Sequence, residues 1–241
     1  MKFKILVAMA AVALATQAIA GPPYLTDDPV PTDEGHWEIY GFVSGEGRHS
    51  TMDADGGFDL NYGALDNLQL TATLPLTFSH DPIDGLRSGP GDLEFGVKYR
   101  FIKDERDGLS VAIFPRAILP TSRSDRQNRT RLLLPIWLGE DISGGTSIFG
   151  GGGYEINPGA GNRNFFEAGL AITHEVTNKV SIGGELTWQQ PDSIDGTNQV
   201  RPGIGSIVKL TRRYALLFSG GPTFADHRTS YHFYTALGLL F

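Results

Sequence analysis

The chain of 241 residues contains no cysteine. It therefore has no disulfide framework and no thiolate metal site, and no cysteine follows the predicted signal cleavage site to carry a lipid. Beyond residue 20 it also lacks any apolar run near the ~18 residues that a membrane helix needs. The longest such run, 132–138, is interrupted by Pro135. Any membrane crossing must therefore use β-strands.

Positive charge is scarce as well. The chain has 20 Lys and Arg against 27 Asp and Glu, and two of the lysines lie in the predicted signal, which leaves a mature charge of −9. Nucleic acids and anionic lipids both favour basic patches. We therefore expect no nucleic-acid partner and no general attraction to anionic lipid.

The N-terminus has the pattern of a secretory signal. Lys2 and Lys4 precede an apolar run at 5–15, and small residues at 18–20 form a cleavage site. The 31 Gly, 14 Phe and 8 Tyr fit a sheet with tight turns better than a helical bundle. We predict a signal peptide at 1–20, an N-terminal periplasmic extension at 21–35 and a β-barrel at 36–241.

Strand-sized segments of alternating character follow one another through the mature chain. Twelve segments are predicted, at 36–46, 57–62, 68–78, 92–101, 109–119, 130–140, 146–156, 164–174, 180–189, 199–210, 214–224 and 231–241. Most match the ~9 to 11 residues of a tilted membrane strand. The prediction is an all-β fold, a closed antiparallel transmembrane β-barrel of about 12 strands. Prolines inside four segments argue against this count, because they remove ladder donors; they are Pro75, Pro115, Pro135 and Pro202.

Long and short connections alternate, as expected when one end of a barrel faces outside and the other faces the periplasm. The longer set is 47–55, 79–91, 120–129, 157–163, 190–198 and 225–230. The shorter set is 63–67, 102–108, 141–145, 175–179 and 211–213. Both termini then lie on the side of the short turns. The last strand ends on Phe241 at the periplasmic rim and resembles the signal read by the outer-membrane assembly machinery, so we assign Phe241 as an assembly signal.

Alternation also assigns faces. Leucines and aromatic residues at 68–78 and 93–101 face lipid, and polar residues between them face inward. The candidate pore-lining residues are Glu94, Lys98, Arg100, Arg116, Arg131, Glu167, Glu185 and Arg201. They form either a selective pore lining or a set of ion pairs that fills the interior. Twelve strands lie between filled barrels of eight and open barrels of 16 to 18, so strand number leaves both open.

Several short motifs are similar to those of one bacterial outer-membrane family. They are GPPYLTDDP at 21–29, GHWE at 35–38, LNYG at 60–63, LPT at 119–121, GGGYEINP at 151–158, GGEL at 183–186 and LLFSG at 216–220. The chain resembles the family labelled as a transporter of the MetA pathway of phenol degradation. The resemblance implies an outer-membrane barrel with a role in the passage of aromatic or other small hydrophobic compounds. It implies no catalytic or ligand residues.

The extension at 21–35 is rich in Pro and Asp. It either folds into the periplasmic mouth as a short plug, with Asp27, Asp28, Asp33 and Glu34 near the entrance, or remains a tethered irregular arm. The looseness of most chain termini favours the arm.

Other motifs carry little chemistry. Asp53 to Asp59 resembles the start of a calcium loop but lacks the later bidentate Glu, and it falls on a predicted outer loop. Ser79 and His80 are adjacent, so on a strand they would point to opposite faces. The six histidines have no ligand spacing. We expect no enzyme activity, no metal and no cofactor.

The leading hypothesis is a channel of the bacterial outer membrane, in contact with membrane lipid and the assembly machinery, that passes an unidentified small solute. A lipid-modifying barrel enzyme, a closed structural or adhesive barrel that binds a partner through its outer loops, and a soluble sandwich are the alternatives.

Overall fold

The computed structural model describes residues 23–104, 108–122, 129–142, 144–226 and 228–241. The predicted signal peptide lies outside these residues. The strands are β1 (Trp37–Arg48), β2 (Thr51–Leu65), β3 (Leu68–Asp81), β4 (Gly85–Pro90), β5 (Leu93–Lys103), β6 (Leu109–Ile113), β7 (Arg116–Leu119), β8 (Arg131–Ile142), β9 (Thr146–Ile156), β10 (Phe165–Thr177), β11 (Val180–Gln189), β12 (Gln199–Lys209), β13 (Tyr214–Ala225) and β14 (Arg228–Leu240). The described part of the chain contains no helix long and apolar enough to cross a membrane.

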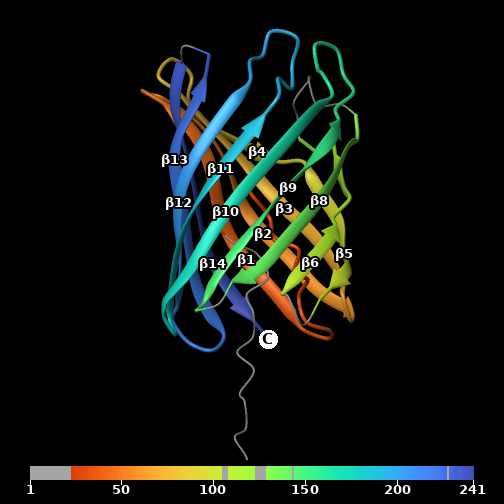
Figure 1. Ribbon diagram of the computed structural model, residues 1–241. Helices are drawn as coiled ribbons and strands as arrows, with labels where there is room; N and C mark the ends of the chain where they lie inside the picture. The colour runs from red at the N-terminus through yellow and green to blue at the C-terminus, as the bar shows by residue number, and fades with distance from the viewer. Residues whose placement is uncertain (1–22, 105–107, 123–128, 143, 227) are drawn as a thin grey trace, which may run out of the picture.

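All of these strands belong to one antiparallel sheet that closes on itself, because β1 pairs with both β2 and β14 (Figure 1). β4 and β5 follow one another along β3, and β6 and β7 follow one another along β8. Counted over the described residues, the wall is therefore 12 strands wide. The predicted closed antiparallel barrel and its strand number are confirmed.

The two faces of the wall follow the alternation of the sequence. On β3, Leu70 and Leu76 expose about half of their surface on the outside, whereas Gln69 and Thr71 are buried inside. The same pattern on β5 exposes Phe95 and buries Lys98. An apolar outer face with a polar interior is the inverse of a soluble protein and suits a lipid-facing barrel. It also excludes the soluble sandwich.

The four strand prolines lie where the ladder is irregular. Pro115 separates β6 from β7, and Pro75 lies where β3 passes from β5 to β4. Both use only their carbonyl oxygens, which accept hydrogen bonds from Val97 and Gly91. Proline has no N–H to donate, so these are the positions that tolerate it.

The other two prolines follow the same rule. The carbonyl of Pro135 on β8 accepts a hydrogen bond from the backbone of Phe114 at the β6–β7 break. Pro202 lies in the stretch of β12 where pairing with β13 is interrupted, between Val200 and Ile204. The prolines interrupt the ladder locally without reducing the strand count.

Three of the predicted long loops are mostly strand. Residues 47–55 and 225–230 are mostly strand, because β1 and β2 meet in a hairpin at 49–50 and β14 begins at Arg228. His49 takes a φ of 54° at the first hairpin, a left-handed conformation that makes a two-residue turn feasible. The aspartates and glycines of 53–57, which imitate a loop, extend β2 to 15 residues instead. The segment 79–91 likewise forms the end of β3 and all of β4.

Candidate functional site

A cavity of about 1410 Å³ lies inside the barrel. It extends from the loop-side ends of the strands, at Asp53 and Ser122, to the segment 24–27 in the interior. Among the described residues that line it, nine are acidic and five are lysine or arginine. The lumen is therefore polar and carries an excess of carboxylates.

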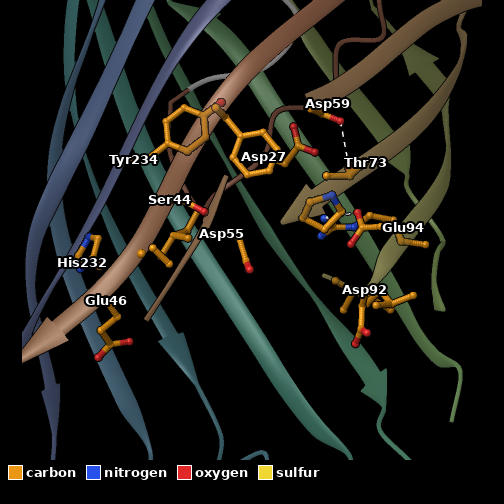
Figure 2. A pocket seen from close by; sticks show the side chains of 18 of the residues that line it. Asp27, Ser44, Glu46, Asp55, Asp59, Thr73, Asp92, Glu94, His232 and Tyr234 are labelled. Atoms are coloured by element: carbon orange, nitrogen blue, oxygen red, sulfur yellow. Dashed lines mark hydrogen bonds and ion pairs between the residues drawn. The ribbon is translucent and has the colours of Figure 1, made fainter. Parts of the chain in front are cut away.

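Six of the nine acidic side chains lie on or beside neighbouring strands of one part of the wall. Figure 2 shows Glu46 of β1, Asp55 and Asp59 of β2, and Asp92 and Glu94 beside β5 facing the same space. The hydroxyl of Thr73 donates a 3.1 Å hydrogen bond to Asp59. These carboxylates approach one another because β1, β2, β3 and β5 are successive neighbours in the sheet.

The arginines of the lumen pair with carboxylates. Arg116 lies 3.2 Å from Glu94, and Arg131 lies 2.9 Å from Glu155 and 3.5 Å from Asp92. Arg201 lies 4.0 Å from Glu46 and donates to Gln189 at 3.2 Å. Such pairing lowers the cost of holding charge inside a barrel. The interior thus combines the two predicted arrangements. The charges form ion pairs, and an open space remains between them.

Six of the eight predicted pore-lining residues line this cavity: Glu94, Lys98, Arg116, Arg131, Glu167 and Arg201. Glu185 instead binds the N-terminal segment. Arg100 lies next to the β2–β3 turn, where its Nε donates to Asn67 at 2.8 Å. Arg100 is two residues nearer the turn-side end of β5 than Lys98 and does not line the cavity.

Among the aromatic residues that line the lumen, Trp137 and Phe114 were not predicted. Trp137 is buried on β8 and has the same parity as Arg131, so strand alternation could have identified it. Phe114 lies at the β6–β7 break and has the same parity as Arg116, so alternation could have identified it too; its ring lies between the Nζ of Lys98 and the guanidinium of Arg116. The ring centroid lies about 5 Å from each cation.

The segment 23–32 lies inside the barrel and forms its plug. Glu185 of β11 holds one part: the backbone N–H groups of Leu25 and Thr26 donate to its two carboxylate oxygens at 3.2 and 3.0 Å, and the hydroxyl of Thr26 donates at 3.1 Å. The hydroxyl of Ser219 donates to the carbonyl of Pro23. A carboxylate that accepts several hydrogen bonds holds its partner strongly.

A buried cation holds the middle of the plug. Lys98 is 1% exposed, and its Nζ lies 3.0 Å from Asp27 and 4.0 Å from Asp28. The far end is held by Gln69, whose side-chain oxygen accepts hydrogen bonds from the backbone and the hydroxyl of Thr32 at 2.8 and 3.1 Å. The amide group of Gln69 donates to Asn61 at 2.7 Å, which fixes its orientation.

Inward-facing glycines make room for the plug. A Cβ atom at Gly169 would lie 3.1 Å from the Cβ of Thr26, and one at Gly139 would lie 2.9 Å from the ring of Pro29. At Gly205 it would lie 2.6 Å from the ring of Tyr24. The wall is therefore shaped to the plug on β8, β10 and β12.

The sequence argument that favoured a tethered arm is wrong for the described residues of this segment. Thr26 and Thr32 are 1% and 2% exposed, and Pro23 and Pro29 are buried. Burial, with a smaller contribution from the charge of Glu185, raises the pKa of Tyr24 to about 12, so the phenol stays neutral at physiological pH. The arm was favoured because chain termini are usually loosely held. That general expectation takes no account of specific binding partners on the barrel wall.

The turn-side interior beside the plug is filled by a small apolar cluster: Tyr40, Ala215, Leu217 and Ala236. Together the plug and this cluster occupy the end of the barrel at which the short turns lie, and the cavity opens toward the other end.

The calcium-like motif lies in β2 instead of an outer loop. Strand geometry spreads Asp53, Asp55 and Asp59 along the wall, so they cannot wrap one ion as a loop does. Across the described residues, the structure has no group of three or more His, Asp or Glu placed to hold a metal ion. Ser79 lines the cavity, whereas the adjacent His80 does not.

Comparison with known proteins gives one family match. The family described as "Putative MetA-pathway of phenol degradation" matches residues 32–238. A search of curated proteins finds no match.

Several solved structures share the fold. An outer membrane channel from Pseudomonas putida F1 is 14% identical, with 88% of this chain and 97% of that chain covered and a TM-score of 0.66. The KdgM porin is 8% identical, with 84% and 98% covered and a TM-score of 0.60. The CymD monoaromatic hydrocarbon channel is 9% identical, with 87% and 88% covered and a TM-score of 0.50. At these identities the likeness shows the fold alone, that of outer-membrane barrels.

Proposed function

Because the chain belongs to the family described as "Putative MetA-pathway of phenol degradation", we propose that it is a channel of the bacterial outer membrane for small aromatic or otherwise hydrophobic compounds. The observation that carries the proposal is the cavity of about 1410 Å³ inside a closed barrel with an apolar outer face. The charged groups of its wall suit the orientation and passage of a solute.

The class of solute rests on the family description, on the aromatic residues of the lumen and on one solved structure that shares the fold. Phe114 and Trp137 place aromatic rings among the lining residues, where a planar solute could stack. CymD, which shares the fold, is by its name a monoaromatic hydrocarbon channel. Uptake into liposomes of single-ring aromatic compounds and of sugars of similar mass tests the class. Faster uptake of sugars would contradict it.

Channel activity itself is tested in planar bilayers. We expect discrete conductance steps and a preference for K⁺ over Cl⁻, because carboxylates outnumber cationic groups in the lumen. Replacing Asp53 and Asp55 with Asn removes two of these charges near the loop-side mouth and should bring the permeability ratio closer to one. Asp195→Asn, on a loop outside the cavity, is the matched control and should leave the ratio unchanged.

A silent bilayer with a folded barrel would contradict the channel. It would favour the closed structural or adhesive barrel. The plug is compatible with that alternative, because the plug fills the turn-side end of the lumen. Deletion of the outer loops would then abolish partner binding.

Phe241 supports a prediction about assembly. Its backbone exchanges two hydrogen bonds with Trp37, at 2.7 and 3.0 Å, at the seam where β14 meets β1. We expect deletion of Phe241 to lower the amount of folded barrel in the outer membrane several-fold, measured by heat-modifiable migration of membrane fractions on gels.

Phe241→Ala separates loss of the aromatic ring from loss of the backbone hydrogen bonds as the cause of reduced assembly. It keeps the backbone hydrogen bonds and removes only the aromatic ring, so a similar loss identifies the ring as the assembly signal. Phe233→Ala, an aromatic position within β14, is the control. Normal membrane levels of the deletion variant would refute the assignment.

A further inference from the structure

An apolar groove of about 760 Å³ lies in the outer surface of the wall, across β10 to β13. Its outward-facing lining consists of two hydrogen-bonded rows: His174, Ile182, Ser206 and Phe218, and Ile172, Gly184, Ile204 and Gly220. Gly184 and Gly220 are the direct neighbours of Ile204 on the two adjacent strands. They leave a hollow on each side of Ile204, whose side chain is 77% exposed.

Positive charge gathers at the end of this groove. The β10–β11 and β12–β13 turns lie side by side, joined by a 2.8 Å hydrogen bond from the backbone of Lys209 to the carbonyl of Lys179. Lys179, Arg212 and Arg213 are exposed on these turns. We call these three residues the basic rim.

Elsewhere on the same rim, carboxylates accompany the exposed Lys103 at the end of β5. The β2–β3 and β5–β6 connections carry Asp66 and Asp104, and Asp141 lies at the end of β8. In a chain with a net charge of −7, a group of three exposed cations thus lies on the two turns beneath the groove. The negative net charge argues against a general attraction of the whole protein to anionic lipid. The local charge at these two turns is positive.

We propose that the groove and the basic rim bind one anionic phospholipid of the periplasmic leaflet. The phosphate lies at Lys179, Arg212 and Arg213, and an acyl chain lies along the groove toward Gly184 and Gly220. The proposal rests on the membrane location given above as part of the proposed function. It extends that function, because it names a lipid partner outside the lumen.

The dimensions agree with this partner. From Lys179 to Gly184 is five residues along a strand, roughly 17 Å at about 3.3 Å per residue. One leaflet contributes about half of a hydrocarbon core that is roughly 30 Å thick. A phosphate at the turns therefore places its acyl chain beside both glycines.

Charge favours a lipid over a second copy of the chain. A two-fold contact through this groove would bring the same surface of both copies together. The two basic rims would then face one another and repel. A phosphate neutralises the rim instead, and each Lys or Arg near the surface adds to the attraction of an anionic headgroup.

Native mass spectrometry of the purified full-length protein tests the site, with phosphatidylglycerol as the anionic probe and phosphatidylcholine as the zwitterionic probe. We expect the wild type to retain phosphatidylglycerol preferentially. The triple variant Lys179→Ser, Arg212→Ser, Arg213→Ser should retain it at least about tenfold less. Gly184→Leu, which fills the groove, should also reduce retention. Lys103→Ser, on the same rim, and Gly41→Leu, on the outer face of β1, are the controls and should retain it normally.

Equal retention of both lipids, or unchanged retention in the rim and groove variants, would overturn the proposal. So would a dimer that Gly184→Leu dissociates, because the groove would then bind a second copy. Bilayer recordings on the same preparations separate this proposal from the channel function. Conductance without lipid retention refutes only the lipid site, whereas lipid retention in a silent barrel refutes only the channel.

Discussion

Deletion of Tyr24 to Val30 is expected to raise the single-channel conductance by roughly threefold or more, because these residues obstruct the turn-side half of the lumen. The barrel itself should remain folded. Its ladders are made between strands, and the plug is held through wall side chains, those of Glu185, Lys98 and Gln69. Planar bilayer recordings measure the change, and heat-modifiable migration on gels verifies the fold.

A point variant should also remove the plug from the lumen, without shortening the chain. The side chain in Gly169→Val would occupy the space of Thr26, and the atoms nearest to its Cβ belong to the side chains of Thr26 and Thr187. It should therefore displace the plug and leave the wall intact. Gly41→Val, whose Cβ would lie 3.8 Å from Phe58 on the outer face, is the control. A folded deletion variant with the conductance of the wild type would show that the plug does not limit passage.

Much of the barrel could be predicted from the sequence because strand alternation is a local property. The outward leucines of β3 and the inward charges of β5 are set by a period of two and by the neighbouring residues. The final strand and its seam with β1 followed from the same pattern, and the register of β1 with β14 runs from Glu38 opposite Leu240 to Gly47 opposite Tyr231.

The ends of β2 could not be predicted in this way. The aspartates at 53 and 55 and the glycines at 56 and 57 give this segment the composition of a loop. In a barrel whose interior is polar, an inward aspartate and an outward glycine are also acceptable strand residues. Composition alone therefore does not separate a polar loop from the loop-side end of a polar-lined strand.

The plug was missed for a different reason. Its contacts join residues 159 or 160 positions apart at Glu185 and 71 positions apart at Lys98. No local pattern encodes such pairing. The inward glycines that accommodate the plug carried a signal, but a glycine in a strand also serves bends and tight packing. Only the closed barrel brings Gly139, Gly169 and Gly205 around one segment.

Lys98→Met is expected to release the plug from the lumen. The variant would leave Asp27 and Asp28 facing a site without the cation that lies 3.0 and 4.0 Å from them. Breaking a buried ion pair costs about 3 to 5 kcal/mol, because it leaves charge uncompensated. Withdrawal of the plug into water avoids this cost, whereas unfolding of the barrel would sacrifice every ladder. At about 3 kcal/mol, the ratio of bound to released plug falls roughly 100-fold.

The absence of cysteine in the chain makes this release measurable. A single Thr26→Cys substitution places a thiol at a position that is 1% exposed when the plug is bound. Its rate of alkylation by a water-soluble maleimide should rise strongly when Lys98→Met is added. Lys103→Met, an exposed position on the same strand, should leave the rate unchanged.

Neutralising the other partner separates electrostatics from packing. If Lys98 acts through its charge, Asp27→Asn should slow alkylation in the Lys98→Met background, because less uncompensated charge remains in the plug. If the alkylation rate of the double variant equals that of Lys98→Met alone, the lysine acts by filling space beside Phe114. An unchanged rate in Lys98→Met itself would show that Glu185 and Gln69 hold the plug without it. The paired buried charges would then contribute to plug register and not to its retention.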